Sequence, residues 1–317
     1  MNLREDQKSG NNRRKFIRLF GLVGTGIAAG LSALYIRDKT QSSKPGSKSH
    51  LQGAARKTVD FEKEQRRNIK LHTEALQKQG REGLAGRKWV LVTDLSKCRN
   101  SRQCIKACQE FHQLRPDQLH LNTLLMQDSS RAAPYFMPKH CQHCDNPPCI
   151  PVCPVNATFK RSDGIVLIDN QRCIGCRLCL AACPYSARIF NWFDPRDAEK
   201  YSKTPYDVEL NVPQKKGTVS KCSFSADKLR KGELPYCVTA CPNGVYWFGD
   251  ENEDAVTNGT TRETVQLSKL LGDHGGYRLM DELGQNPGVY YLPPVNRKVP
   301  VPVAEIQNNG KWTEQGA

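Results

Sequence analysis

Two cysteine runs between residues 141 and 184 constrain this chain more than any other part of its sequence. The later run reads Cys-x2-Cys-x2-Cys-x3-Cys-Pro, the bacterial ferredoxin pattern, and the earlier one has two extra residues between its second and third cysteines. In that pattern three thiolates hold one [4Fe–4S] cluster, and the cysteine before proline binds a neighbouring cluster. The runs consist of Cys141, Cys144, Cys149 and Cys153, then Cys173, Cys176, Cys179 and Cys183.

Two such runs close together predict that each run lends its last cysteine to the other. Thiolates are soft ligands that suit iron–sulfur clusters. Short gaps let one tight loop carry three ligands, with Gly175 supplying permissive backbone, and a helical turn ended by proline carries the fourth ligand away. We therefore expect two [4Fe–4S] clusters, one held by Cys141, Cys144, Cys149 and Cys183 and one by Cys173, Cys176, Cys179 and Cys153.

Zinc binding and disulfide bonding are the alternatives for a chain with 14 cysteines. Zinc sites usually contain two Cys-x2-Cys pairs separated by a longer spacer, not runs of four that end in Cys-Pro. Disulfide frameworks are typical of small secreted domains, whereas this chain has 317 residues. The pattern therefore favours iron–sulfur clusters over a secreted zinc or disulfide protein.

Two further runs, one on each side of the first two, have serine in place of the second cysteine. By the same crossing, we expect one outer cluster at Cys98, Cys104 and Cys241, and the other at Cys222, Cys237 and Cys108. Ser101 and Ser225 occupy the second ligand positions. The four runs form an internal repeat.

The N-terminal segment 1–37 is predicted to be a twin-arginine export signal. Arg13 and Arg14 precede Phe16, and the uncharged stretch Leu19–Ile36 follows. Such a signal would deliver the folded protein to the periplasm or the outer face of the cytoplasmic membrane. The alternative is an uncleaved anchor helix, since 18 residues span about 27 Å. Whether the signal is cleaved stays open.

The excess positive charge lies in the leader rather than in the cysteine-bearing body. The net charge is +15, but residues 1–88 carry 20 Lys and Arg against 8 Asp and Glu, and the rest carry 27 against 24. We therefore expect no nucleic-acid partner. The predicted organisation is a linker or tether at 38–87, a cluster-bearing body at 88–249 and a wrapping tail at 250–317.

Four segments of the chain are predicted to form strands. Residues 89–95 and 245–248 should pair with each other, and residues 119–126 and 163–169 have strand composition. With helical turns in the cysteine runs, this pattern predicts an α+β fold. A charged helix is expected within 58–80.

The sequence resembles the four-cluster iron–sulfur subunits of the molybdopterin oxidoreductase (dimethyl sulfoxide reductase) family. Across residues 88–293, the motifs that carry the resemblance are Pro138–Cys149, Asp163–Val166, Cys173–Cys176, Ala182–Tyr185, Lys221–Cys222, Lys231–Pro235 and Ala240–Pro242. The resemblance implies two ferredoxin-like dicluster modules. It implies electron transfer between a molybdopterin-type catalytic subunit and a polytopic quinone-binding membrane subunit or cytochrome, with no substrate chemistry in this chain.

Ser101 and Ser225 depart from the family pattern, which has cysteine at both positions. Loss of the second ligand commonly leaves a [3Fe–4S] cluster, whereas a hard serine oxygen suits an intact [4Fe–4S] cluster less well. A third alternative is that these outer sites are degenerate. The protein would then be a structural subunit that ties a larger complex together. Four histidines near the runs are further candidate ligands: His112, His120, His140 and His143.

Overall fold

The computed structural model describes residues 63, 64, 67, 71, 74, 75, 77–129, 132–201 and 204–295. The chain divides into two compact units, 1–68 and 69–317, and of the first unit residues 63, 64 and 67 are described as helical. The predicted export signal and most of the predicted linker lie outside the described residues. Within the described part, the helices include none that is long and apolar enough to cross a membrane.

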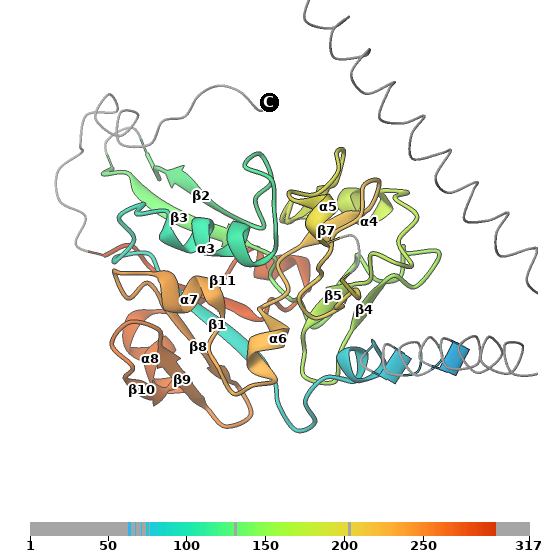
Figure 1. Ribbon diagram of the computed structural model, residues 1–317. Coiled ribbons are helices and arrows are strands. Elements are labelled where there is room, and N and C mark those ends of the chain that lie inside the picture. Colours follow the sequence, from blue (N-terminus) through green and yellow to red (C-terminus); the bar gives the residue numbers. More distant parts are fainter. Residues whose placement is uncertain are drawn as a thin grey trace, which may run out of the picture. The chain divides into compact units, whose positions relative to one another are not determined.

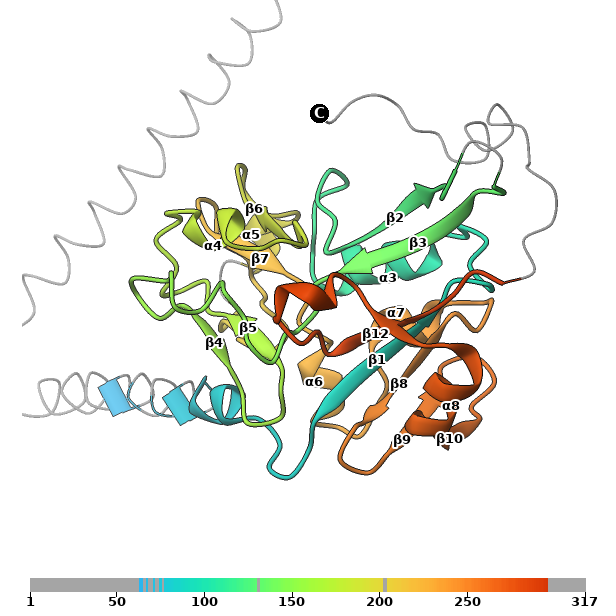
Figure 2. The same ribbon diagram turned by 180° about the vertical axis from the view of Figure 1, so that it is seen from behind.

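A six-stranded sheet forms the centre of the second unit (Figure 1). In spatial order its strands are β10 (Thr264–Gln266), β9 (Ala255–Asn258), β8 (Tyr246–Asp250), β1 (Trp89–Asp94), β12 (Val289–Leu292) and β11 (Tyr277–Arg278). The predicted pairing of 89–95 with 245–248 is confirmed, because β1 and β8 are antiparallel with Leu91 opposite Phe248. On its other side β1 pairs in parallel with β12, which comes from the tail (Figure 2).

The two faces of the sheet bury different partners because alternate residues of β1 point to opposite sides. Val90 and Val92 pack with Leu267 and Leu270 of the helix α8 (Leu267–His274). Leu91, in contrast, belongs to a larger core that contains cysteines of the two outer runs. The face of the sheet that carries Leu91 therefore packs against the two outer cysteine runs.

Three two-stranded antiparallel sheets are the other sheets of the described residues. They are β2 (Leu121–Met126) with β3 (Tyr135–His140), β4 (Thr158–Lys160) with β5 (Val166–Ile168), and β6 (Arg188–Phe190) with β7 (Val219–Lys221). The predicted strands at 119–126 and 163–169 are thus present, the second one shorter than expected. β4 to β7 surround a separate small core that contains cysteines of the inner runs. This core lies on the side of the sheet away from α8 in both views (Figures 1 and 2).

Besides α8, six short helices follow β1 in the described part of the chain, and three of them hold cysteines. They are α3 (Gln103–Phe111), α4 (Leu178–Ala181), α5 (Ala198–Tyr201), α6 (Ala226–Leu229), α7 (Tyr236–Ala240) and the 3-10 helix η1 (Asp281–Leu283). α3 contains Cys104 and Cys108, α4 contains Cys179 and α7 contains Cys237. These are the helical turns that the cysteine spacing predicts.

Residues on both sides of the predicted body are tightly joined to it. Arg81, within the segment predicted as linker, donates to Asp169 at 2.8 Å. The tail supplies β9 to β12 to the central sheet, so up to residue 295 it forms part of the fold rather than a surface wrapping. Both connections join residues far apart in the sequence.

Candidate iron–sulfur centres

The four cysteine runs begin with loops of the same backbone shape. Two residues after the first cysteine of each run, the backbone takes a positive φ: 54° at Asn100, 44° at His143, 72° at Gly175 and 54° at Phe224. A residue other than glycine rarely adopts this conformation. The runs with serine therefore keep the loop geometry of the runs with a full set of cysteines.

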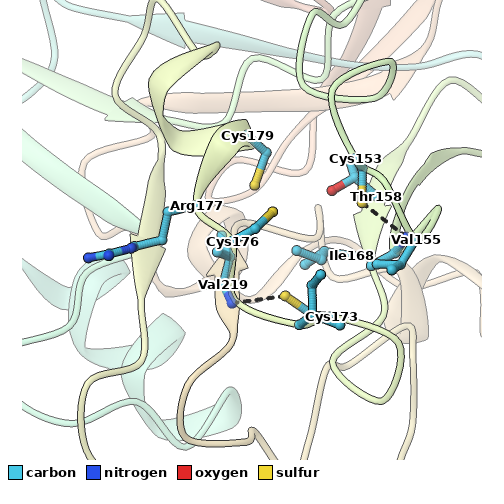
Figure 3. Close-up of a pocket in the computed structure, with 11 residues that line it drawn as sticks. Cys153, Val155, Thr158, Ile168, Cys173, Cys176, Arg177, Cys179 and Val219 are labelled. Carbon is cyan, nitrogen blue, oxygen red and sulfur yellow. Dashed lines mark hydrogen bonds between the residues drawn. The ribbon is translucent and has the colours of Figure 1, made fainter.

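Site 1 is a hollow lined by the four cysteines that the crossed arrangement brings together, Cys153, Cys173, Cys176 and Cys179. They come from two separate loops, as Figure 3 shows. Backbone N–H groups reach two of the sulfur atoms: Ala157 donates to Cys153 at 3.2 Å, and Val219 donates to Cys173 at 3.5 Å. Burial would raise the pKa of Cys153, but the backbone N–H groups around it lower that pKa overall.

Site 2 is a second hollow, lined by Cys141, Cys144, Cys149 and Cys183. These are the four cysteines expected around the other inner cluster. Tyr185 and Arg188 also line this hollow, and the Arg188 guanidinium donates to the Cys149 sulfur at 2.9 Å. Burial and the other three thiolates of the site raise the pKa of Cys144 to about 12.

The outer cysteines also form two sets, site 3 (Cys108, Cys222 and Cys237) and site 4 (Cys98, Cys104 and Cys241). In site 3, burial and then the neighbouring thiolates of Cys222 and Cys108 raise the pKa of Cys237 well above its usual value. In site 4, burial and the thiolates of Cys104 and Cys241 raise the pKa of Cys98 to about 11. The structure therefore brings together the outer sets that the crossing predicts.

The two serines have different surroundings. Ser101 is exposed at the start of the run that leads into α3. Ser225 is buried, and its hydroxyl accepts a hydrogen bond from the Tyr236 N–H at 3.2 Å, beside Cys237 in the sequence. Of the two hydroxyls, that of Ser225 is better placed to serve a cluster.

All four histidines near the runs are buried. Burial lowers the pKa of His140 to about 4 and that of His143 well below its usual value, so these rings are neutral. Ligand atoms of His112, His120 and Cys108 lie within 4.8 Å of one another. The sequence did not identify this trio, because His120 is 12 residues beyond Cys108 and reaches it only through the fold.

The donor chemistry of the sites fits iron–sulfur clusters. Burial and the other thiolates of site 2 raise the pKa of Cys144, so four thiolates in that hollow are stable only if bound cations offset their charge. The Tyr185 hydroxyl beside site 2 has no hydrogen-bond partner within the described residues, as expected for a wall that faces another group. Clusters would be held by the cysteines of sites 1 to 4 and would supply one-electron chemistry there.

Comparison with known proteins agrees with this chemistry. Residues 132–196 match a family described as 4Fe-4S dicluster domain, which contains the inner eight cysteines. One selenate reductase subunit, from Mesobacillus selenatarsenatis, is 37% identical over 218 residues, covering 64% of this chain and 71% of that protein. The menaquinone reductase iron-sulfur cluster-binding subunit of Nitratidesulfovibrio vulgaris is 36% identical over 237 residues, covering 65% and 88%.

A third relative is a subunit of a different reductase. It is a tetrathionate reductase subunit of Salmonella typhimurium, 32% identical over 218 residues, with 67% of this chain and 74% of its own length covered. Each match is much longer than the 132–196 dicluster segment. The chain belongs to the iron–sulfur electron-transfer subunits of the molybdopterin oxidoreductase (dimethyl sulfoxide reductase) family.

Proposed function

We propose that this protein relays electrons one at a time along a row of four iron–sulfur clusters in an exported, membrane-associated respiratory complex. The row would connect a quinone-reactive membrane subunit or cytochrome with a molybdopterin-type catalytic subunit. Sites 1 and 2 would hold [4Fe–4S] clusters, and sites 3 and 4 would hold [3Fe–4S] or serine-ligated [4Fe–4S] clusters. The chain itself would have no substrate site.

The observation that carries this proposal is that each cysteine set lies next to the following one. The Cys149 thiolate of site 2 adds to the effect of burial in raising the pKa of Cys179 in site 1. Cys141 of site 2 acts on Cys222 of site 3 in the same direction. Cys104 of site 4 acts similarly on Cys108 of site 3. Packing supports the same neighbours, because Cys149 and Cys179 share one core and Cys104 and Cys108 both lie on α3. Lys221 donates to Val166, which lines site 2, and to Cys222 of site 3. The sets would therefore follow one another in the order 1, 2, 3, 4, with the exposed Cys176 of site 1 at one end.

The relatives support the setting of the relay. They include subunits named for selenate, menaquinone and tetrathionate reductases, so this chain would also work inside a larger oxidoreductase. The twin arginines at Arg13 and Arg14 support export of the folded, cluster-loaded chain to the periplasm. Attachment to the membrane would come from the partner or from an uncleaved N-terminal helix.

One observation favours a second candidate, a structural subunit with inert outer sites. Ser101 is exposed, and the Ser225 hydroxyl already accepts a backbone hydrogen bond, so neither is committed to iron. Purification of the full chain without oxygen, iron and sulfide counts, and a redox titration followed by EPR would separate the two. The relay requires that all occupied sites change oxidation state, and outer sites that are empty or inert would favour the structural role. Absence of acid-labile sulfide would eliminate both.

A further inference from the structure

Lys221, the last residue of β7, is one of the most deeply buried side chains of the molecule, at 1% exposure. Its ammonium group donates to the carbonyl oxygens of Val166 and of Cys222, the latter at 2.7 Å. No carboxylate in the described part of the chain forms an ion pair with it. A buried charge is costly unless something of opposite sign offsets it.

Arg188, in β6, is a second buried cation, at 6% exposure. Its guanidinium donates to the Thr158 hydroxyl at 3.2 Å and to the Cys149 sulfur at 2.9 Å. Again, no carboxylate of the described residues pairs with it. Burial alone would lower the pKa of Arg188, but the thiolates of Cys149 and Cys179 outweigh it and raise that pKa.

Another buried cation of the same molecule has its charge offset by carboxylates. Arg161 is also buried, and it binds two carboxylates, Asp163 at 2.6 Å and Glu209 at 2.5 Å. The fold can therefore place carboxylates beside a buried cation. Arg188 has the Cys149 sulfur in that place, and Lys221 has two backbone carbonyl oxygens, one of them that of Cys222.

The two cations stand at successive junctions of the row. Arg188 donates to Cys149 of site 2 and to Thr158, which lines site 1. Lys221 donates to the carbonyl oxygen of Val166, which lines site 2, and to that of Cys222 in site 3. Among the described residues, neither Arg188 nor Lys221 contacts a cysteine of site 4. Each cation thus faces two cysteine sets at once.

We propose that Arg188 and Lys221 are fixed positive charges between neighbouring clusters, Arg188 between sites 1 and 2 and Lys221 between sites 2 and 3. This inference rests on the proposed function. Reduction adds one negative charge to a cluster, so a nearby cation stabilises the reduced form and raises the reduction potential. A cation between two clusters also lessens their repulsion when both are reduced. These are positioning residues that adjust the relay, and they do not bind iron.

The test is a redox titration of the full chain, purified without oxygen and followed by EPR. Arg188→Met and Lys221→Met remove the charges, and Lys269→Met removes an exposed charge on α8 as the matched control. We expect each buried substitution to reduce the ratio of reduced to oxidised form at least tenfold at two sites, about 59 mV for a one-electron couple. The couple of site 2 should respond to both substitutions, those of sites 1 and 3 to one each, and that of site 4 to neither.

The inference is overturned if no couple moves by more than twofold, or if all couples move together as they do in the Lys269 control. If the methionine variants do not load iron and sulfide, Arg188→Lys and Lys221→Arg decide the matter. If these charge-retaining variants bind a full complement of iron and sulfide and keep their reduction potentials, the inference is supported. If they do not bind iron and sulfide, the site requires the shape of the side chain rather than its charge. Clusters that are present but insensitive refute the inference alone, whereas wild-type protein without sulfide refutes the proposed function.

Discussion

Sites 1 and 2 gather eight cysteines with the Arg188 guanidinium on one of their sulfur atoms, whereas sites 3 and 4 gather six. The groups that touch the outer sulfur atoms are neutral: the Tyr246 hydroxyl at Cys104 and the Phe224 N–H at Cys222, both at 3.5 Å. Fewer thiolates carry less negative charge and need less compensation. Of the four sets, site 2 would have both buried cations beside it, sites 1 and 3 one each, and site 4 neither.

Removal of an inner ligand should have the largest effect. Cys149→Ala takes a thiolate from site 2 and leaves the Arg188 guanidinium without its sulfur partner. We expect site 2 to lose its [4Fe–4S] cluster, because that cluster is held by four thiolates: about one iron atom per chain is lost if a [3Fe–4S] cluster remains, and about four if the site empties. Iron and acid-labile sulfide counts measure it. Unchanged counts would show that the inner sites do not depend on a complete cysteine set.

The loop of site 1 should tolerate less change than its equivalent in site 3. A Cβ at Gly175, where φ is +72°, would lie 2.1 Å from the Gly217 carbonyl oxygen. The equivalent residue in site 3 is Phe224, so the positive φ is not itself prohibitive. Gly175→Ala should therefore displace the Gly217 backbone and selectively weaken iron retention at site 1.

Gly232 provides the matched control, because it has the same φ of +72° with nothing within 4 Å of an added Cβ. Gly232→Ala should cost about 1–2 kcal/mol in the free energy of unfolding from its backbone alone and leave the iron count unchanged. Iron release under a chelator, together with thermal unfolding, compares the two variants. Equal iron retention would mean that the Gly217 contact does not constrain site 1.

The missing outer ligand can be restored. Ser225→Cys adds a fourth thiolate to site 3, three residues after Cys222, on a loop that has a positive φ at the same position as the inner runs. If site 3 holds a [3Fe–4S] cluster, the variant should gain about one iron atom and its EPR signal should change to that of a [4Fe–4S] cluster. Ser225→Ala serves as the control. If the iron count of Ser225→Cys equals that of the unchanged protein, site 3 already holds four iron atoms or none.

Local and non-local features of this fold differ in how far the sequence predicts them. Cysteine spacing predicts the grouping of the 14 cysteines because loops and single helical turns are set by nearby residues, as with Cys104 and Cys108 on α3. The insertion of β12 beside β1 was not predicted, since about 200 residues separate them and the apolar run alone does not specify a partner.

The buried cations were not predicted for a similar reason. In the sequence, Lys221 is only one residue of the Lys221–Cys222 motif, and nothing sets Arg188 apart from the other arginines. Whether a charge is buried beside sulfur or exposed depends on packing of β6 and β7 against the cysteine loops. The His112, His120 and Cys108 trio is likewise a product of tertiary packing. The sequence thus predicted which cysteines lie together, whereas the electrostatic surroundings required the structure.

The smallest expected effect concerns a neutral contact at site 4. Tyr246 is buried in β8 and donates from its hydroxyl to the Cys104 sulfur. Tyr246→Phe removes this hydrogen bond, which opposes the effect of burial on the pKa of Cys104. A neutral hydrogen bond contributes about 1 kcal/mol, so the reduced form at site 4 should lose less than tenfold in relative population. A shift as large as that of Arg188→Met, measured in the same EPR titration, would show that a buried charge is not what distinguishes sites 1 to 3 from site 4.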